Sequence, residues 1–167
     1  MIRKAKQEDV MAISKIHVDG WRATYKGIVS EDFLNSMNYT EQEAQWKERY
    51  FDNKNTTEVI LVVEDEKEKV AGFIVIETVS KNPLVDGSID NLYIAESHHN
   101  KGYGTLLFKE GVEVLKKSGA KTFDLGAFKE NKKACSFYEK LGGQPYKEKI
   151  CNFGGAEVIG IGYMFNC

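Results

Sequence analysis

Apolar positions in the first third of the chain recur at helical spacing. Residues 8–25 carry apolar side chains three and four positions apart, which predicts an amphipathic helix. Two shorter helices should follow, because Ser30 is a good N-cap and Thr40 opens a capping-box pattern that continues to about residue 50. A short strand at 2–5 precedes them, so this part of the chain is predicted to be mainly helical.

The hydrophobic period changes after residue 56. Runs of β-branched and aliphatic residues predict strands at 57–63, 70–76, 88–95, 121–127 and 158–165. The charged stretch 64–69 reads as a hairpin turn between the first two. An amphipathic helix should run from Tyr103 to about Ser118, and a second from its cap Asn131 to Leu141. Strand, helix and strand in this order predict a parallel, right-handed crossover. The expected fold is therefore α/β (α+β), a three-layer α/β/α domain on a mixed sheet.

Composition narrows the function classes. With 167 residues, 42% hydrophobic and 29% charged, the chain is expected to form one domain spanning 1–167. Its net charge of −2 argues against nucleic acid as a partner, and no apolar run is long enough for a membrane span. Three cysteines without a CxxC pair favour free thiols in the cytoplasm, and three histidines without ligand spacing predict no metal site.

The segment 92–107 carries the first functional signal. It reads as a strand, a tight loop with Gly102 and Gly104, and the first turn of a helix. Such a loop presents unpaired backbone N–H groups and the positive end of a helix dipole, which together bind phosphate. A side chain at either glycine would hold the anion away from the backbone. A plain glycine turn is the alternative interpretation of this loop taken alone.

A second segment, 131–143, decides between them. Together the two segments resemble the GNAT superfamily of acetyl-CoA-dependent N-acetyltransferases, with His99–Gly104 matching the pyrophosphate motif and Asn131–Gly142 matching the later Asn-x-x-Ala-x-x-x-Tyr-x-x-x-Gly motif. The resemblance implies the acyl-CoA N-acyltransferase fold, a mostly antiparallel sheet whose two central parallel strands splay around acetyl-CoA. The implied cosubstrate contacts are Leu92, Tyr93, Ile94, His99, Asn100, Lys101, Gly102, Tyr103, Gly104, Thr105, Asn131 and Tyr138. His99 departs from the family, which usually has Arg or Gln there.

The same resemblance suggests catalytic groups. Tyr138 aligns with the tyrosine that protonates the leaving thiolate, although it could simply pack on its helix. Many relatives place a Glu on one splayed strand, but the matching positions here look like Ser88 and Gly126. Asp90 on the third predicted strand is the nearest acidic residue and the candidate base, and Glu77 lies at the end of the second. A water chain, or binding of an amine that is already neutral, is an equal alternative.

The acceptor is less defined by the sequence. Trp21 and Tyr25 resemble a branch of the family in which this segment lines the acceptor pocket, and core packing is the alternative for both. The sequence predicts transfer of acetyl to a primary amine, of a small molecule or a peptide N-terminus, by direct attack in a ternary complex. A non-catalytic acyl-CoA-binding or sensing protein on the same fold is the alternative function, and a homodimer is compatible with either.

Overall fold

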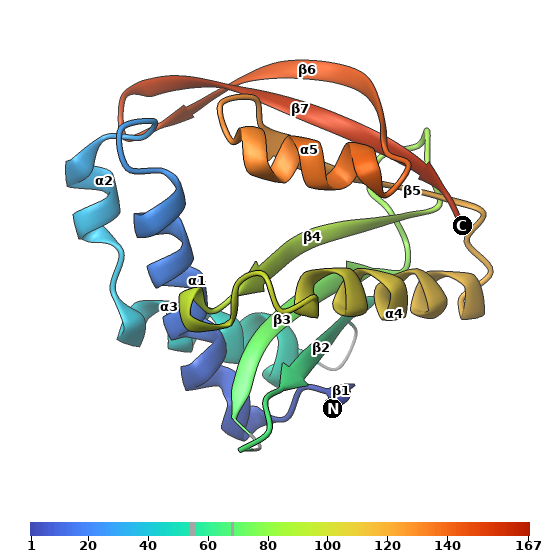
Figure 1. Ribbon diagram of the computed structural model, residues 1–167, viewed down its shortest axis with the longest axis horizontal. Coiled ribbons are helices and arrows are strands. Elements are labelled where there is room, and N and C mark those ends of the chain that lie inside the picture. The colour runs from blue at the N-terminus through green and yellow to red at the C-terminus, as the bar shows by residue number, and fades with distance from the viewer. Residues whose placement is uncertain (54–55, 68) are drawn as a thin grey trace.

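A twisted mixed sheet forms the centre of the protein (Figure 1). The computed structural model describes residues 1–53, 56–67 and 69–167, and these form seven strands in the order β1-β2-β3-β4-β5-β7-β6. Neighbouring strands are antiparallel except β4 and β5, which are parallel. The predicted fold class is thereby confirmed. The strands are β1 Ile2–Lys4, β2 Glu58–Glu64, β3 Val70–Glu77, β4 Gly87–Ile94, β5 Thr122–Phe128, β6 Gln144–Phe153 and β7 Ala156–Asn166.

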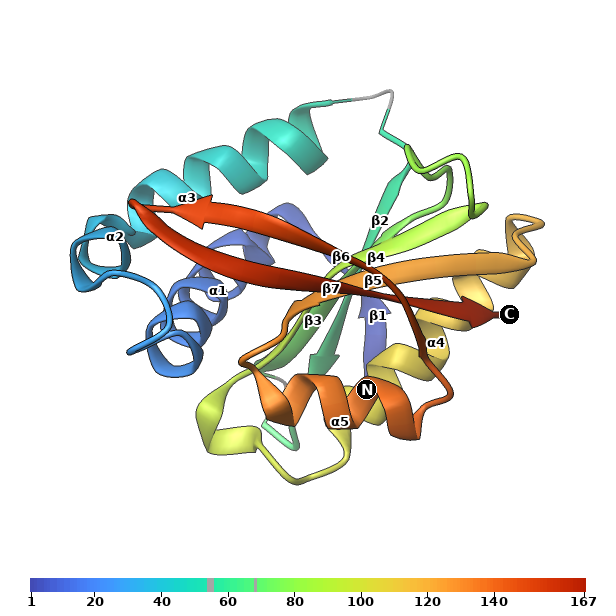
Figure 2. The same ribbon diagram turned by 90° about the horizontal axis from the view of Figure 1, so that it is seen from above.

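Helices cover both faces of the sheet (Figure 2). Alternate residues of β3 face opposite layers: Ile74 and Ile76 join the core under α4 and α5, whereas Phe73 and Val75 join the core under α1 and α3. Both faces of β3 are therefore buried, and this explains why its sequence is a continuous apolar run without polar alternation. The helices are α1 Val10–Thr24, α2 Glu31–Ser36, α3 Tyr39–Trp46 with a π-helical turn at Lys47–Asp52, α4 Tyr103–Lys117 and α5 Lys132–Lys140, and 3-10 turns lie at Gln7–Asp9 and Glu96–His98.

Two sequence expectations need correction. Strand β6 was not predicted, because it is an edge strand with mostly exposed side chains and therefore shows no apolar alternation. The predicted capping box at Thr40 is wrong, since the N-cap is Asn38, two residues earlier, and its side chain accepts the hydrogen bond from Glu41 N at 2.8 Å. The predicted caps at Ser30 and Asn131 are confirmed. The predicted turn at 64–69 includes residue 68, which lies outside the described residues.

The two parallel strands diverge after a short paired stretch. Pairing of β4 with β5 runs only from Gly87–Phe123 to Ile89–Leu125. Beyond it, β4 continues along β3 and β5 continues along β7. The register of β3 against β4 shifts at Asp90, which is an extra residue on β4, and such a bulge bends the strand. The splay that the sequence resemblance implied is thus present, and it opens the sheet at its centre.

Candidate active site

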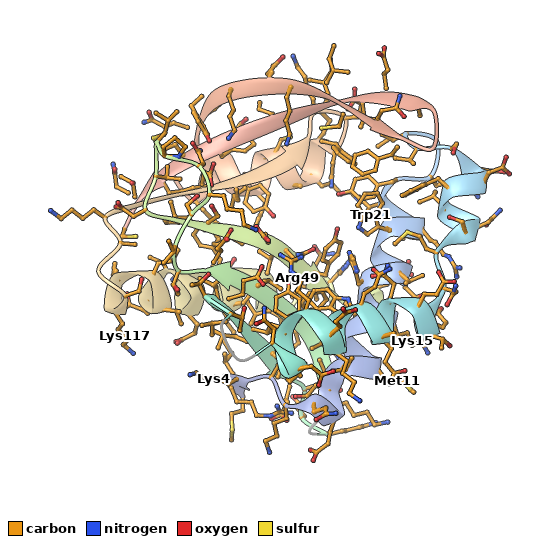
Figure 3. All side chains as sticks on the ribbon, turned by 180° about the vertical axis from the view of Figure 1, so that it is seen from behind. Lys4, Met11, Lys15, Trp21, Arg49 and Lys117 are labelled. Atoms are coloured by element: carbon orange, nitrogen blue, oxygen red, sulfur yellow. The ribbon has the colours of Figure 1, made fainter. Side chains whose placement is uncertain are left out.

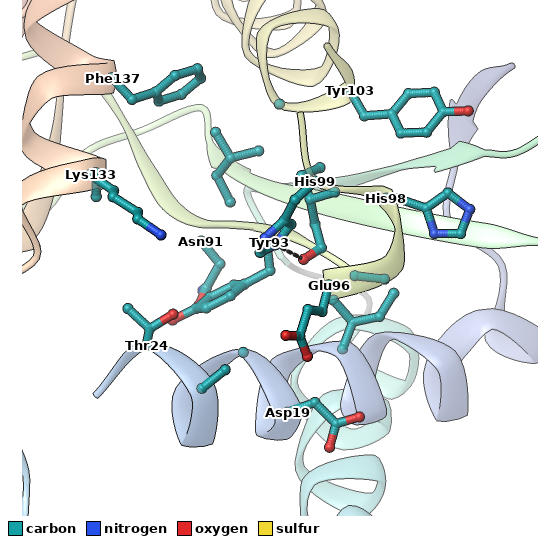
Figure 4. Close-up of a pocket in the computed structure, with 18 of the residues that line it drawn as sticks. Asp19, Thr24, Asn91, Tyr93, Glu96, His98, His99, Tyr103, Lys133 and Phe137 are labelled. Atoms are coloured by element: carbon teal, nitrogen blue, oxygen red, sulfur yellow. Dashed lines mark hydrogen bonds between the residues drawn. The ribbon is translucent and has the colours of Figure 1, made fainter. Parts of the chain in front are cut away.

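A long cleft runs from the splayed strands to the start of α4. It is lined by the second half of β4, by the loop before α4, by the end of β5, and by the cleft-facing sides of α5 and α1. The cosubstrate residues expected from the sequence line this cleft, apart from Lys101, which lies in the same loop. The fold therefore brings the two sequence motifs, about 30 residues apart in the chain, onto one cavity (Figure 4).

The loop before α4 has the geometry of an anion site. Asn100 and Gly102 both adopt left-handed conformations, with φ of 61° and 81°. Such residues turn successive backbone N–H groups to one side, and α4 begins there without a side-chain cap. Gly104 follows on the first turn, where an added Cβ would lie 3.5 Å from Phe137 and 3.9 Å from Ile94. The absence of a side chain at Gly104 thus keeps the passage between α4 and α5 open.

Both histidines of the loop are already engaged. His99 Nε2 lies 2.9 Å from the Ile94 carbonyl oxygen, which makes this nitrogen a donor to the strand (Figure 4). His98 Nε2 lies 3.2 Å from Asp65 Oδ2. The phosphate contact expected of His99 stays a prediction. Because Nε2 of His99 donates to β4, the groups that the loop offers to an anion are mainly its backbone N–H groups.

Helix α5 supplies the opposite wall. The Asn131 side chain accepts a hydrogen bond from Ala134 N at 3.2 Å, so it caps the helix while lining the cleft. Tyr138 is buried and reaches the inner end of the cleft. Burial, together with the neighbouring Tyr25 and Cys135, raises the pKa of the Tyr138 phenol above its ordinary value. The Tyr138 phenol is therefore protonated at neutral pH.

A second cleft opens on the other side of the splay, and Trp21, one of its lining residues, is labelled in Figure 3. One end is aromatic: the Trp21 ring lies 4.5 Å from Tyr25, 5.9 Å from Phe128 and 5.6 Å from Phe153, measured between ring centroids. The other end is polar and is formed by the end of β3, the loop at 80–82 and β6. The structure thus brings together Trp21 and Tyr25 as expected, and adds two phenylalanines that lack a local sequence signal.

The two clefts meet at the point where β4 and β5 diverge. Eight residues line both: Tyr25, Ile89, Asp90, Asn91, Tyr93, Leu125, Gly126 and Ala127. Space remains at this junction, because a Cβ added to Gly126 would meet only the Ile161 carbonyl oxygen, at 3.9 Å. The two clefts therefore share walls and lie next to each other at the divergence of β4 and β5.

Comparison with known proteins agrees with this geometry. The family model of the acetyltransferase (GNAT) family matches residues 21–143. An uncharacterised N-acetyltransferase of Bacillus subtilis (strain 168), YuaI, is 32% identical over 97% of this chain and 91% of its own length. The chain belongs to the GNAT family. As a member it is an acetyl-CoA-dependent N-acetyltransferase, which confirms the activity class expected from the paired motifs.

More distant relatives of this GNAT chain carry specific names. A spermidine N(1)-acetyltransferase of Thermoplasma acidophilum is 24% identical over 84% of this chain and 86% of its own length. The crystal structure of PaiA N-acetyltransferase from Thermoplasma acidophilum, in complex with coenzyme A, has a TM-score of 0.70 at 22% identity. That alignment covers 99% of this chain and 98% of the other, and it shows a shared fold.

The candidate base of this GNAT protein is held by an arginine. Asp90 Oδ2 accepts a hydrogen bond from Arg49 Nη2 at 2.9 Å, and the same guanidinium also pairs with Glu58. Asp90 lines both clefts, whereas Glu58 lines neither. The structure therefore places Asp90 at the junction but with one oxygen occupied.

A buried carboxylate that the sequence did not reveal lies beside this junction. Asp124 accepts hydrogen bonds from Ser88 Oγ at 2.7 Å, from Asn82 Nδ2 at 2.9 Å and from the Tyr146 hydroxyl, and Lys147 Nζ lies 3.4 Å away. Burial alone would raise its pKa, but these hydrogen bonds and the Lys147 charge lower it. The one local signal was a charge in the middle of an apolar strand.

Two properties of the described residues complete the picture. None of the helices in 1–53, 56–67 and 69–167 has the length and apolar character that crossing a membrane requires. Within the same residues, no group of three or more His, Cys, Asp or Glu gathers in a way that could hold a metal ion.

Proposed function

We propose that the protein transfers the acetyl group of acetyl-CoA to a primary amine by direct attack, with both substrates bound together. The observation that carries this proposal is the junction of the two clefts, whose shared walls include Tyr25, Asp90 and Gly126. Reactants held on two sides of one opening can react directly with each other, because binding supplies the proximity that the reaction needs.

The cosubstrate is held mainly by backbone groups. The N–H groups from Asn100 to Thr105 bind the diphosphate at the start of α4. Leu92, Tyr93 and Ile94 lie beyond the last β4–β5 pair, so their edge facing β5 can pair with the pantetheine amides instead. Asn131 contacts the same arm of the ligand from α5.

Each proton of the reaction has a proposed carrier. The neutral amine nitrogen attacks the thioester carbonyl, the C–S bond breaks, and Tyr138 donates its hydroxyl proton to the leaving sulfur. Burial keeps that phenol protonated until the sulfur carries negative charge. Asp90 is the proposed acceptor of the proton lost by the amine, directly or through water, although Arg49 holds one of its oxygens.

The acceptor we propose is a small-molecule amine, with a peptide N-terminus as the alternative form. Trp21, Tyr25 and Phe128 supply an apolar wall, and Glu77 and Asp90 contribute carboxylates at the other end. An aromatic wall with nearby carboxylates suits an amine that arrives protonated. The named relative that acetylates spermidine supports an amine acceptor.

The place of action we propose is the cytoplasm. Cys135, Cys151 and Cys167 are free thiols in the structure, as expected in a reducing compartment.

Initial-rate kinetics test the proposal. Release of free CoA thiol is measured with a panel of amines that includes spermidine, amino acids and short peptides. For any amine that reacts, double-reciprocal plots against both substrates should intersect, and incubation with acetyl-CoA alone should leave the protein mass unchanged. Parallel lines with an acetylated protein would contradict direct attack. Saturable acetyl-CoA binding without thiol release on any amine would favour the sensing alternative.

A further inference from the structure

Two lysines stand at the positive end of a helix. Lys132 and Lys133 are the first two residues of α5, whose first turn contains no acidic residue. The helix dipole places partial positive charge at this end, so cations there are unfavourable. Neither lysine has an ion pair among the residues that the structure describes. Among the described residues, no ion pair therefore offsets this charge.

Only one of the two lysines reaches the cosubstrate cleft. Lys133 lines it, and its side chain extends from α5 into the cavity opposite the loop of His99 (Figure 4). Lys132 is also exposed but does not line the cleft. The two residues occupy neighbouring positions in the first turn of α5 and carry the same charge, but only Lys133 lines the cleft.

The loop across the cleft has few free cations of its own. His98 is paired with Asp65, His99 directs Nε2 to the Ile94 carbonyl, and Lys101 does not line the cleft. The loop therefore offers N–H groups to a polyanion, and a full positive charge facing them comes from α5.

We propose that Lys133 binds a phosphate group of acetyl-CoA from the α5 side of the cleft. This inference rests on the proposed binding of acetyl-CoA between α4 and α5. The ligand's negative charge offsets the unfavourable charge at the start of α5 and completes a clamp with the N–H groups of the α4 loop. Both the diphosphate and the 3′-phosphate carry the chemistry that an ammonium group recognises.

Calorimetric titration with matched variants tests it. Lys133→Ala should weaken acetyl-CoA binding about 10-fold at low salt, as expected for loss of a hydrogen bond between charged groups. Lys132→Ala should change the affinity less than about 2-fold, because screened charges outside the cleft contribute little. The loss in Lys133→Ala should shrink as salt is raised, and Lys133→Arg should restore most of the affinity.

The source of the phosphate is resolved by a second ligand. If the effect of Lys133→Ala persists with acetyl-dephospho-CoA, the contact is to the diphosphate; if it disappears, the contact is to the 3′-phosphate. The inference is overturned if Lys133→Ala binds acetyl-CoA as wild type does, if Lys132→Ala loses as much, or if the loss does not depend on salt. Failure of the wild-type protein to bind acetyl-CoA would instead contradict the proposed function.

Discussion

Ser88 and Asp124 face each other on the two parallel strands, and the Ser88 hydroxyl donates a hydrogen bond to Asp124 Oδ1 at 2.7 Å. One residue further along, Ile89 and Leu125 make the last paired contact before the strands diverge. The buried carboxylate also holds Asn82 of the loop that borders the second cleft. This interaction thus fixes both the apex of the splay and one wall of the proposed acceptor cleft.

Asp124→Asn should destabilise the protein by about 1–3 kcal/mol in the free energy of unfolding at pH 7. Asparagine has only one accepting oxygen, so its NH₂ group would face either the Ser88 hydroxyl or the donors of Asn82 and Tyr146, and in both cases the charge that strengthens these hydrogen bonds is lost. Urea denaturation of wild type and variant measures the difference. Ser88→Ala is the milder control, because it removes one donor and leaves the carboxylate's other partners in place.

The difference between wild type and Asp124→Asn should depend on pH. The folded protein lowers the pKa of Asp124, so this carboxylate contributes stability above the unfolded pKa of about 3.9. That contribution is lost as pH falls through the lower, folded pKa. The gap in unfolding free energy should stay constant from pH 7 to pH 5 and shrink below about pH 4. A gap that is unchanged at pH 2.5 would contradict a stabilising role for the charge.

Gly104→Val should abolish the rise in melting temperature that acetyl-CoA produces, while the free protein stays folded. The added side chain would fill the space between α4 and Phe137. Gly104→Ala serves as the control: it adds one methyl group at ordinary contact distance and improves helix propensity by up to about 1 kcal/mol. It should therefore keep part of the thermal shift. Normal acetyl-CoA binding by Gly104→Val would show that the loop assignment is wrong.

Tyr138→Phe should lower kcat by about 10²-fold with little change in acetyl-CoA affinity. The substitution keeps the ring of this buried, cleft-lining residue and removes its hydroxyl. Tyr163→Phe is a matched control, because its ring lies 6.1 Å from Tyr138 while its hydroxyl donates to Glu139. If the two variants have the same kcat as wild type under conditions where chemistry limits the rate, water is the proton source.

Asp90→Asn distinguishes a base from a structural partner of Arg49. Both Asp90 and Glu58 pair with this guanidinium, but only Asp90 reaches the junction. As a base, Asp90→Asn should reduce kcat by about 10²-fold or more, and Glu58→Gln should leave kcat near the wild-type value. Equal effects of the two variants on kcat would assign Asp90 to positioning Arg49 and return the role of base to water.

Local sequence patterns determined much of this protein. Helices and strands followed their hydrophobic periods, and Ser30 and Asn131 cap their helices, because capping depends on groups within three residues. Gly102 adopts the left-handed conformation expected of a tight loop. Residue order alone therefore indicated the α4 loop, the α5 motif and the family.

Tertiary structure decided the rest. Strand β6 forms because it pairs with β7, and the partners of Asp124 come from three separate segments, the loop at 80–82, β4 and β6, which no local period encodes. The direction of His99 depends on where the splayed β4 leaves the Ile94 carbonyl. The junction between the clefts exists only after α1, β4 and β5 have packed together. Such features depend on contacts between distant residues, whose geometry is fixed only when the whole sheet has formed.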